Sequence, residues 1–161
     1  MLKNILKQKI NITDKSMEPT FMHGDFIVMR KIIFSYDPKR FDLILFENNG
    51  INLLKRVVGL KNEIIEISNG NLIINENSLK EDFKDNKFIF DFPKTILKKD
   101  EVFVLGDNRE FSKDSRNFGA IKIKNILSRR KSKFFSQFVY FIFRNITFRA
   151  PFYIINYCVI K

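Results

Sequence analysis

One serine and one lysine carry the chemistry that this 161-residue sequence suggests. Ser16 begins the segment SMEPTF, which directly precedes a turn and an apolar run. A serine hydroxyl is a weak nucleophile until a neighbouring base removes its proton. The single histidine, His23, lies in an apparent turn and is one candidate base. A serine–histidine pair also needs an orienting carboxylate, and no feature of the sequence selects one, so His23 can equally be an ordinary turn residue.

Lys55 is the other candidate base. A lysine in water has a pKa of about 10.4 and is almost fully protonated at neutral pH, so it cannot accept a proton there. Burial among apolar side chains disfavours the ammonium and lowers the pKa. Lys55 lies between Leu53-Leu54 and Val57-Val58 on an expected core strand, whereas most other lysines lie in polar stretches. The alternative is a lysine that extends into solvent from the edge of a sheet.

A third segment, GDNREFSKDSRNFG at residues 106–119, is expected to be a polar loop between two strands. In this order, SMEPT, KRVVG and the loop resemble three signature motifs of the bacterial signal peptidase I family, serine endopeptidases with a Ser–Lys dyad. Residues 40–46, RFDLILF, are similar to a further motif of that family. The resemblance covers roughly residues 10–126 and rests mainly on the long loop motif.

The resemblance implies a role for each matching residue. Ser16 would be the nucleophile and Lys55 the general base, and Ser112 would hydrogen-bond the lysine and orient it. Met17 would pack beside the nucleophile, and four charged residues of the loop would brace the site: Asp107, Arg109, Asp114 and Arg116. The alternative for these four is a solvated loop of ion pairs. Neither a cofactor nor a metal is implied.

Substrate pockets follow from the same resemblance. Signal peptidases cut after small residues at the first and third positions before the bond, and shallow apolar pockets can exclude larger side chains. The matching residues are Ile10, Ile12, Leu45 and Leu54, which can equally be ordinary core aliphatics. An extended substrate would add as a strand beside residues 10–14 or beside the strand that contains Leu45.

The sequence departs from the family pattern at two positions near the site. The backbone N–H of Ser16 is the expected oxyanion donor, and some members add a serine hydroxyl two residues before the nucleophile. Here that position is Asp14, which cannot donate when ionised, so either the oxyanion hole has fewer donors or Asp14 turns away. The second departure is Phe41, where the family motif usually has glycine.

The elements that must position these residues are mostly strands. Short apolar runs separated by turn signals predict strands at 25–31, 42–47, 51–59, 63–68, 71–76, 101–107 and 118–127. Asn69-Gly70 predicts a hairpin turn. We therefore expect a mainly β fold of coiled antiparallel sheets. Residues 1–9 would be a short lead-in, 10–126 the catalytic domain with a loosely packed polar excursion at 75–100, and 127–161 a basic, aromatic-rich and helical tail.

The net charge of +11 is concentrated in the last quarter of the chain. The first 116 residues contain 20 basic and 18 acidic residues, whereas the last 45 contain nine basic and no acidic ones. A basic tail can bind nucleic acid or an anionic membrane, and the apolar run FVYFIF favours a helix lying in the membrane interface. The alternatives are a spanning anchor, in which Arg144 and Arg149 would be costly, and a tail packed on the protein's own core. One cysteine and one histidine make a zinc site unexpected. Residues 1–15 contain no apolar stretch long enough to span a membrane, where the family normally has a spanning helix.

The family resemblance, together with the basic apolar tail, implies a membrane-associated serine endopeptidase that removes signal peptides from exported precursors. Its active site would lie on the outer face of the cytoplasmic membrane, its partners would be those precursors and the membrane surface, and no nucleic-acid partner is expected. One rival is a peptidase with the same dyad and another substrate, either conjugation-linked or self-cleaving. The other is a non-catalytic module whose tail binds lipid or nucleic acid.

Overall fold

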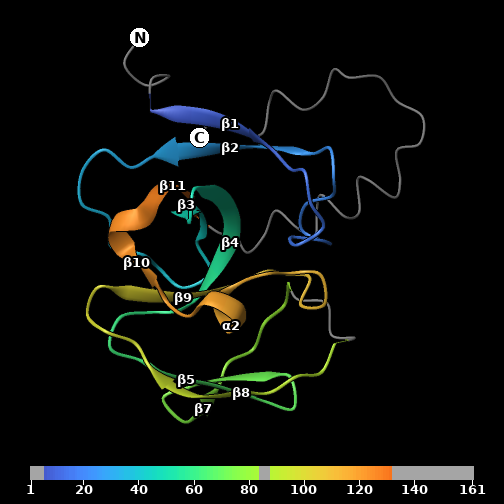
Figure 1. Cartoon of the computed structure of the whole chain (residues 1–161), viewed down its shortest axis with the longest axis vertical. Helices are drawn as coiled ribbons and strands as arrows, with labels where there is room; N and C mark the ends of the chain where they lie inside the picture. The colour runs from blue at the N-terminus through green and yellow to red at the C-terminus, as the bar shows by residue number, and fades with distance from the viewer. Residues whose placement is uncertain (1–5, 84–87, 132–161) are drawn as a thin grey trace.

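The computed structural model describes residues 6–83 and 88–131, and their architecture is two antiparallel sheets (Figure 1). The larger has seven strands in the order β1-β2-β11-β3-β4-β9-β10, and the smaller has four in the order β7-β6-β5-β8. The predicted mainly β, antiparallel fold is therefore confirmed. The strands of the larger sheet are β1 (Lys7–Asn11), β2 (Phe26–Lys31), β3 (Leu43–Asn48), β4 (Ile51–Gly59), β9 (Glu101–Leu105), β10 (Ile121–Lys122) and β11 (Ile126–Arg130).

The smaller sheet comprises β5 (Ile64–Ser68), β6 (Asn71–Ile74), β7 (Asn77–Ser78) and β8 (Phe92–Ile96). Its central hairpin turns at Asn69 and Gly70, which have φ angles of 49° and 74°, as a two-residue turn of this kind requires. The predicted hairpin is therefore confirmed. The only regular helices among the described residues are the single turn α2 (Ser115–Phe118) and the 3₁₀ turn η1 (Ile123–Asn125), and none could cross a membrane.

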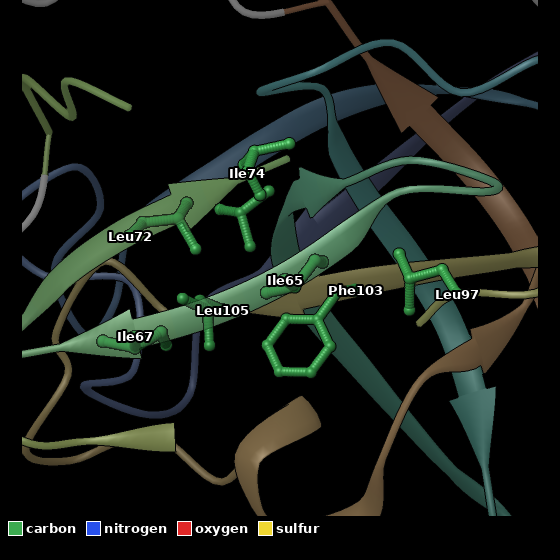
Figure 2. Packing of buried hydrophobic residues seen from close by; sticks show 8 residues of the cluster. Ile65, Ile67, Leu72, Ile74, Leu97, Phe103 and Leu105 are labelled. Atoms are coloured by element: carbon green, nitrogen blue, oxygen red, sulfur yellow. The ribbon is translucent and has the colours of Figure 1, made fainter. Parts of the chain in front are cut away.

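A core of aliphatic and aromatic side chains joins the smaller sheet to β9. Ile65 and Ile67 of β5 and Leu72 and Ile74 of β6 pack with Phe103 and Leu105 of β9 (Figure 2). Gly59, at the end of β4, has no room for a side chain, because an added Cβ would lie 1.9 Å from Ile65 Cδ1. The smaller sheet is therefore fixed against the strands that carry the site.

Four parts of the chain differ from their predicted structure. Residues 7–9 are not part of a lead-in, because they belong to β1 and pair with β2. Residues 75–100 are not a loosely packed excursion, because β8 pairs with β5 and the side chains of Phe83 and Leu97 are buried. The run 118–127 is not one strand, because β10 pairs with β9, whereas β11 pairs with β2 and β3 after the η1 turn. β11 also continues to Arg130, beyond the predicted domain boundary at residue 126. The predicted helical tail lies almost wholly at 132–161, outside the described residues.

Candidate active site

Ser16 lies in a tight turn between β1 and β2. The backbone N–H of Phe21 donates to the carbonyl of Met17, and the N–H of Glu18 donates to that of Lys15. Met17 is buried in a core formed from β2 and β3, which anchors the residue next to Ser16. The carbonyl of Ser16 accepts a hydrogen bond of 3.1 Å from the N–H of Asn108, so the 106–119 loop directly holds the turn that contains Ser16.

Lys55 reaches this turn from β4. The backbone of Lys55 pairs with that of Ile44 on β3. Both residues of the pair of interest are buried, because Lys55 is 1% exposed and Ser16 is 3% exposed. Lys55 Nζ donates to Ser16 Oγ at 2.7 Å and to the carbonyl of Leu54 at 3.0 Å. The structure therefore brings the predicted nucleophile and base into direct contact, although they are 39 residues apart.

Burial lowers the pKa of Lys55 below that of an ordinary lysine. The negative charges of Asp14, Asp114 and Asp107 oppose this effect, because each favours the ammonium form. The burial effect is the larger one, so the amine of Lys55 loses its proton more readily in this site than it would in water. A neutral amine can accept the proton of a serine hydroxyl.

Asp107 forms a buried bidentate ion pair with Arg56. The guanidinium Nε and Nη2 donate to its two carboxylate oxygens at 2.8 and 2.7 Å, and both side chains are about 1% exposed. The hydroxyl of Thr20, from the nucleophile turn, also donates to Asp107. Because Arg56 directly follows Lys55 on β4, this cluster joins the lysine strand, the loop and the nucleophile turn. Sequence reasoning missed Arg56 and Thr20. A second cation inside an apolar strand was the available signal for Arg56.

Asp114 and Arg116 stabilise the loop from within. Asp114 accepts a hydrogen bond from the N–H of Gly106 at 3.0 Å and caps α2. The guanidinium of Arg116 donates to both carboxylate oxygens of Asp114 and, at 2.7 Å, to the carbonyl of Arg109. These residues are therefore not a solvated set of ion pairs, since Asp114 is fully buried.

Arg109 ties the loop to the segment after β7. Its guanidinium pairs with the buried carboxylate of Glu81, with contacts at 2.5 and 3.2 Å, and its Nε donates to the carbonyl of Gly106. Glu81 was also missed, because it lies in the stretch that the sequence suggested was loosely packed. Gly106 itself is required, because an added Cβ would lie 2.5 Å from the carbonyl oxygen of Ser16.

Ser112 does not make the hydrogen bond that the family resemblance implies. Its Oγ is buried and has no hydrogen-bond partner among the described residues. The Lys55 ammonium instead donates to Ser16 Oγ and the Leu54 carbonyl. Ser112 packs against Gly106, where its Oγ would lie 2.2 Å from an added Cβ, so it remains within the site without orienting the lysine in this arrangement.

Asp14 does not turn away from the nucleophile. Its Oδ1 accepts hydrogen bonds from the N–H of Ser16 at 2.9 Å and from the hydroxyl of Ser16 at 2.8 Å. His23, by contrast, is exposed, and its Nδ1 lies 3.0 Å from the carbonyl oxygen of Thr13. No contact between His23 and Ser16 occurs in the described structure, so the geometry does not support a histidine base.

The four predicted pocket residues lie together in one apolar cluster. Ile10, Ile12, Leu45 and Leu54 all belong to the cluster that contains Met17, with Ile12 and Leu45 buried and the other two half-buried. Their role in substrate binding stays a prediction.

Phe41 has a φ angle of 69°, a left-handed conformation that favours glycine. This conformation accounts physically for the glycine that is usual in the similar motif. Its carbonyl accepts a hydrogen bond from Arg56.

Comparisons with known proteins agree with the site. A family model described as "Signal peptidase, peptidase S26" matches residues 1–135. Signal peptidase I of Bacillus caldolyticus is 33% identical over 80% of this chain and 81% of that protein. Signal peptidase I V of Bacillus subtilis is 35% identical over 78% of this chain and 84% of that protein.

Two further matches extend the comparison. The crystal structure of a signal peptidase I from Enterococcus faecalis superposes with a TM-score of 0.52 at 32% identity, covering 60% of this chain and 98% of that one. A probable thylakoidal processing peptidase 2 of Arabidopsis thaliana is 29% identical over 80% of this chain. The chain spans only about two fifths of the length of that plant relative, since the match covers 38% of it.

Replacement of Lys55 by methionine should stabilise the fold. At neutral pH the unfolded chain carries a solvated ammonium, whereas folding must bury it, so Lys55→Met should raise the free energy of unfolding by about 0.5–2 kcal/mol. Because the folded pKa is lowered, wild-type stability rises with pH between the folded pKa and about 10.4. The advantage of the variant should therefore shrink across that range.

Urea unfolding at several pH values measures this effect. The matched control is Lys61→Met, because Lys61 is exposed and pairs with Asp37 at the surface, and it should show no comparable gain. A Lys55→Met variant that is less stable than wild type at pH 7, or whose advantage grows with pH, would contradict the account of the buried amine.

Proposed function

Because the chain belongs to the signal peptidase, peptidase S26 family, we propose that it cleaves signal peptides from exported precursor proteins, with Ser16 as nucleophile and Lys55 as general base. The observation that carries the proposal is the 2.7 Å contact between Lys55 Nζ and Ser16 Oγ within a nearly water-free setting. A buried amine with a lowered pKa, next to a hydroxyl, is the arrangement that activates a serine without histidine.

Lys55 would move the proton in both halves of the reaction. As Ser16 Oγ attacks the scissile carbonyl carbon, the neutral amine takes the hydroxyl proton, and the resulting ammonium gives it to the leaving amine. Water then attacks the acyl carbon while Lys55 takes a proton from it. As the bond from that carbon to Ser16 Oγ breaks, the ammonium returns the proton to Oγ, which restores the serine and the neutral amine. The backbone N–H of Ser16 is the expected donor to the oxygen that becomes negative.

The braced loop would supply rigidity. Asp107, Asp114, Arg109 and Arg116 make buried contacts that fix the 106–119 loop, and Asn108 of that loop holds the carbonyl of Ser16. Proton transfer is sensitive to displacements of about 1 Å, so such bracing contributes to rate without contact with the substrate.

Selection of small residues would come from the apolar cluster beside the serine. Ile10, Ile12, Leu45 and Leu54 pack with Met17, which directly follows the nucleophile. A densely packed apolar surface of this kind offers little volume to a substrate side chain, so alanine fits and a larger residue is rejected. The substrate would bind as an extended strand beside residues 10–14. The strand that contains Leu45 cannot take this role, because β3 is already paired with β11 on one side and with β4 on the other.

The basic tail would place the enzyme at a membrane. Residues 127–161 contain seven basic and no acidic residues, which favours contact with anionic lipid headgroups. We place the active site on the outer face of the cytoplasmic membrane, because exported precursors present their cleavage sites there.

Ser16→Ala and Lys55→Ala should each abolish cleavage of a precursor with alanine at the first and third positions before the bond. Each variant removes one of the two groups that act as a unit, so the loss should be at least about a thousandfold. Lys61→Ala, an exposed lysine in a surface ion pair, is the matched control and should cleave normally. Cleavage retained by either site variant, measured by electrophoresis of the products, would rule out the dyad.

The membrane role is tested by flotation with vesicles that contain anionic phospholipid. The full chain should float with the vesicles and release as salt is raised, because screening weakens surface attraction. A chain that ends at residue 131 keeps all of β11 and should remain in the bottom fraction. Equal flotation of the two proteins would show that the tail is not the membrane-binding segment.

A further inference from the structure

Asp14 holds both groups of Ser16 that the proposed reaction needs. A single oxygen, Oδ1, accepts the backbone N–H at 2.9 Å and the hydroxyl at 2.8 Å. The N–H is the expected oxyanion donor, and the hydroxyl is the nucleophile. Asp14 therefore contacts a reacting atom, and its effect on catalysis depends on where the protons lie.

The proton of the Ser16 hydroxyl lies on the Asp14 side in this arrangement. An ionised carboxylate has no proton to give, so a 2.8 Å contact with Ser16 Oγ requires the hydroxyl to be the donor. Lys55 Nζ must then donate to the same oxygen at 2.7 Å. The lysine is a donor here and not an acceptor, so the proton transfer that starts the reaction cannot occur while this arrangement persists.

The oxyanion donor is also occupied. A substrate carbonyl oxygen that becomes negative needs the N–H of Ser16, but Asp14 Oδ1 already accepts that bond. Two negative oxygens cannot share one donor at close range without strong repulsion. A productive complex therefore requires Asp14 to leave.

Asp14 differs from the other two carboxylates that act on Lys55. Asp107 and Asp114 are fully buried and are held by Arg56 and Arg116. Asp14 is exposed and forms no ion pair within the described part of the chain. Among the described contacts, release of Asp14 breaks only its two hydrogen bonds to Ser16 and exposes the carboxylate to water, whereas release of either of the other two would break a buried ion pair.

We propose that Asp14 is an internal latch, which blocks the Ser16 N–H and hydroxyl in the free enzyme and is displaced by the carbonyl group of the substrate. This inference rests on the proposed Ser16–Lys55 function and adds a resting state to it. When Asp14 moves away, the N–H of Ser16 becomes free to donate to the oxyanion, and the hydroxyl proton can turn toward Lys55. The negative charge of Asp14, which is the strongest of the charges that favour the ammonium form of Lys55, also leaves the site. The latch keeps the serine unreactive until a peptide occupies the site.

Asp14→Ala and Asp14→Ser test the latch with the full chain and a probe that needs no turnover. The probe is a peptide boronic acid, acetyl-Ala-Ala-boroalanine. Ser16 Oγ bonds to its boron, the hydroxyl proton passes to neutral Lys55, and the tetrahedral boronate that forms carries the negative charge at the oxyanion position. Its dissociation constant is measured between pH 6 and pH 10 by calorimetry.

Both variants should bind the boronate at least about tenfold more tightly than wild type, because no hydrogen bond to a carboxylate must be broken first. The serine variant should bind most tightly, since its hydroxyl can donate to the boronate. The midpoint of the pH dependence should fall to lower pH in both variants, because loss of the Asp14 charge makes the ammonium of Lys55 easier to deprotonate. A purely structural role of Asp14 would not move this midpoint.

Asp37→Ala is the matched control, because it removes one carboxylate from an exposed position that does not act on Lys55, and it should bind like wild type. Equal or weaker boronate binding by Asp14→Ala would overturn the latch while leaving the dyad intact. A boronate that binds Ser16→Ala as tightly as wild type would overturn the proposed function, and the latch with it.

Discussion

The contact between Lys55 and Ser16 requires an amine to be kept away from water inside a sheet, and most of the site follows from that requirement. An ammonium buried without a full set of partners is costly, so the strand that carries Lys55 must be fixed by other interactions. β4 is central in the larger sheet, with β3 on one side and β9 on the other. This position supplies the burial that lowers the pKa of the amine.

The 106–119 loop holds the turn that contains Ser16 against the strand that carries Lys55 and so acts as a rigid bridge. Arg56 on β4 pairs with Asp107 of the loop, and Asn108 of the loop holds the carbonyl of Ser16. Gly106 permits this close approach because it has no side chain. The buried ion pairs carry a desolvation cost of their own, but loss of one partner would leave an unpaired charge in the core, so the bridge is stable only when complete.

The sequence predicted the residues that chemistry and backbone geometry restrict most. Lys55 could be identified because a lysine between aliphatic pairs on a core strand needs a reason to be there. The Asn69-Gly70 turn could be identified because few residues adopt its φ angles. Contacts between distant segments could not be predicted. The pairing of Arg109 with Glu81, the isolation of the Ser112 hydroxyl and the position of Asp14 depend on how the loops fold over one another. The break between β10 and β11 was missed because alternation continues through it while the partner strand changes.

Direct titration of the Lys55 amine tests the central claim most simply. The ε-carbon signals of lysine can be followed by NMR from neutral to alkaline pH, with Lys55→Arg used to assign the resonance. The account predicts one lysine whose midpoint lies below those of the surface lysines near 10.4, because its ammonium is desolvated beside Ser16. A Lys55 signal that titrates together with the surface lysines would contradict it, since such an amine would be charged at neutral pH and unable to activate the serine.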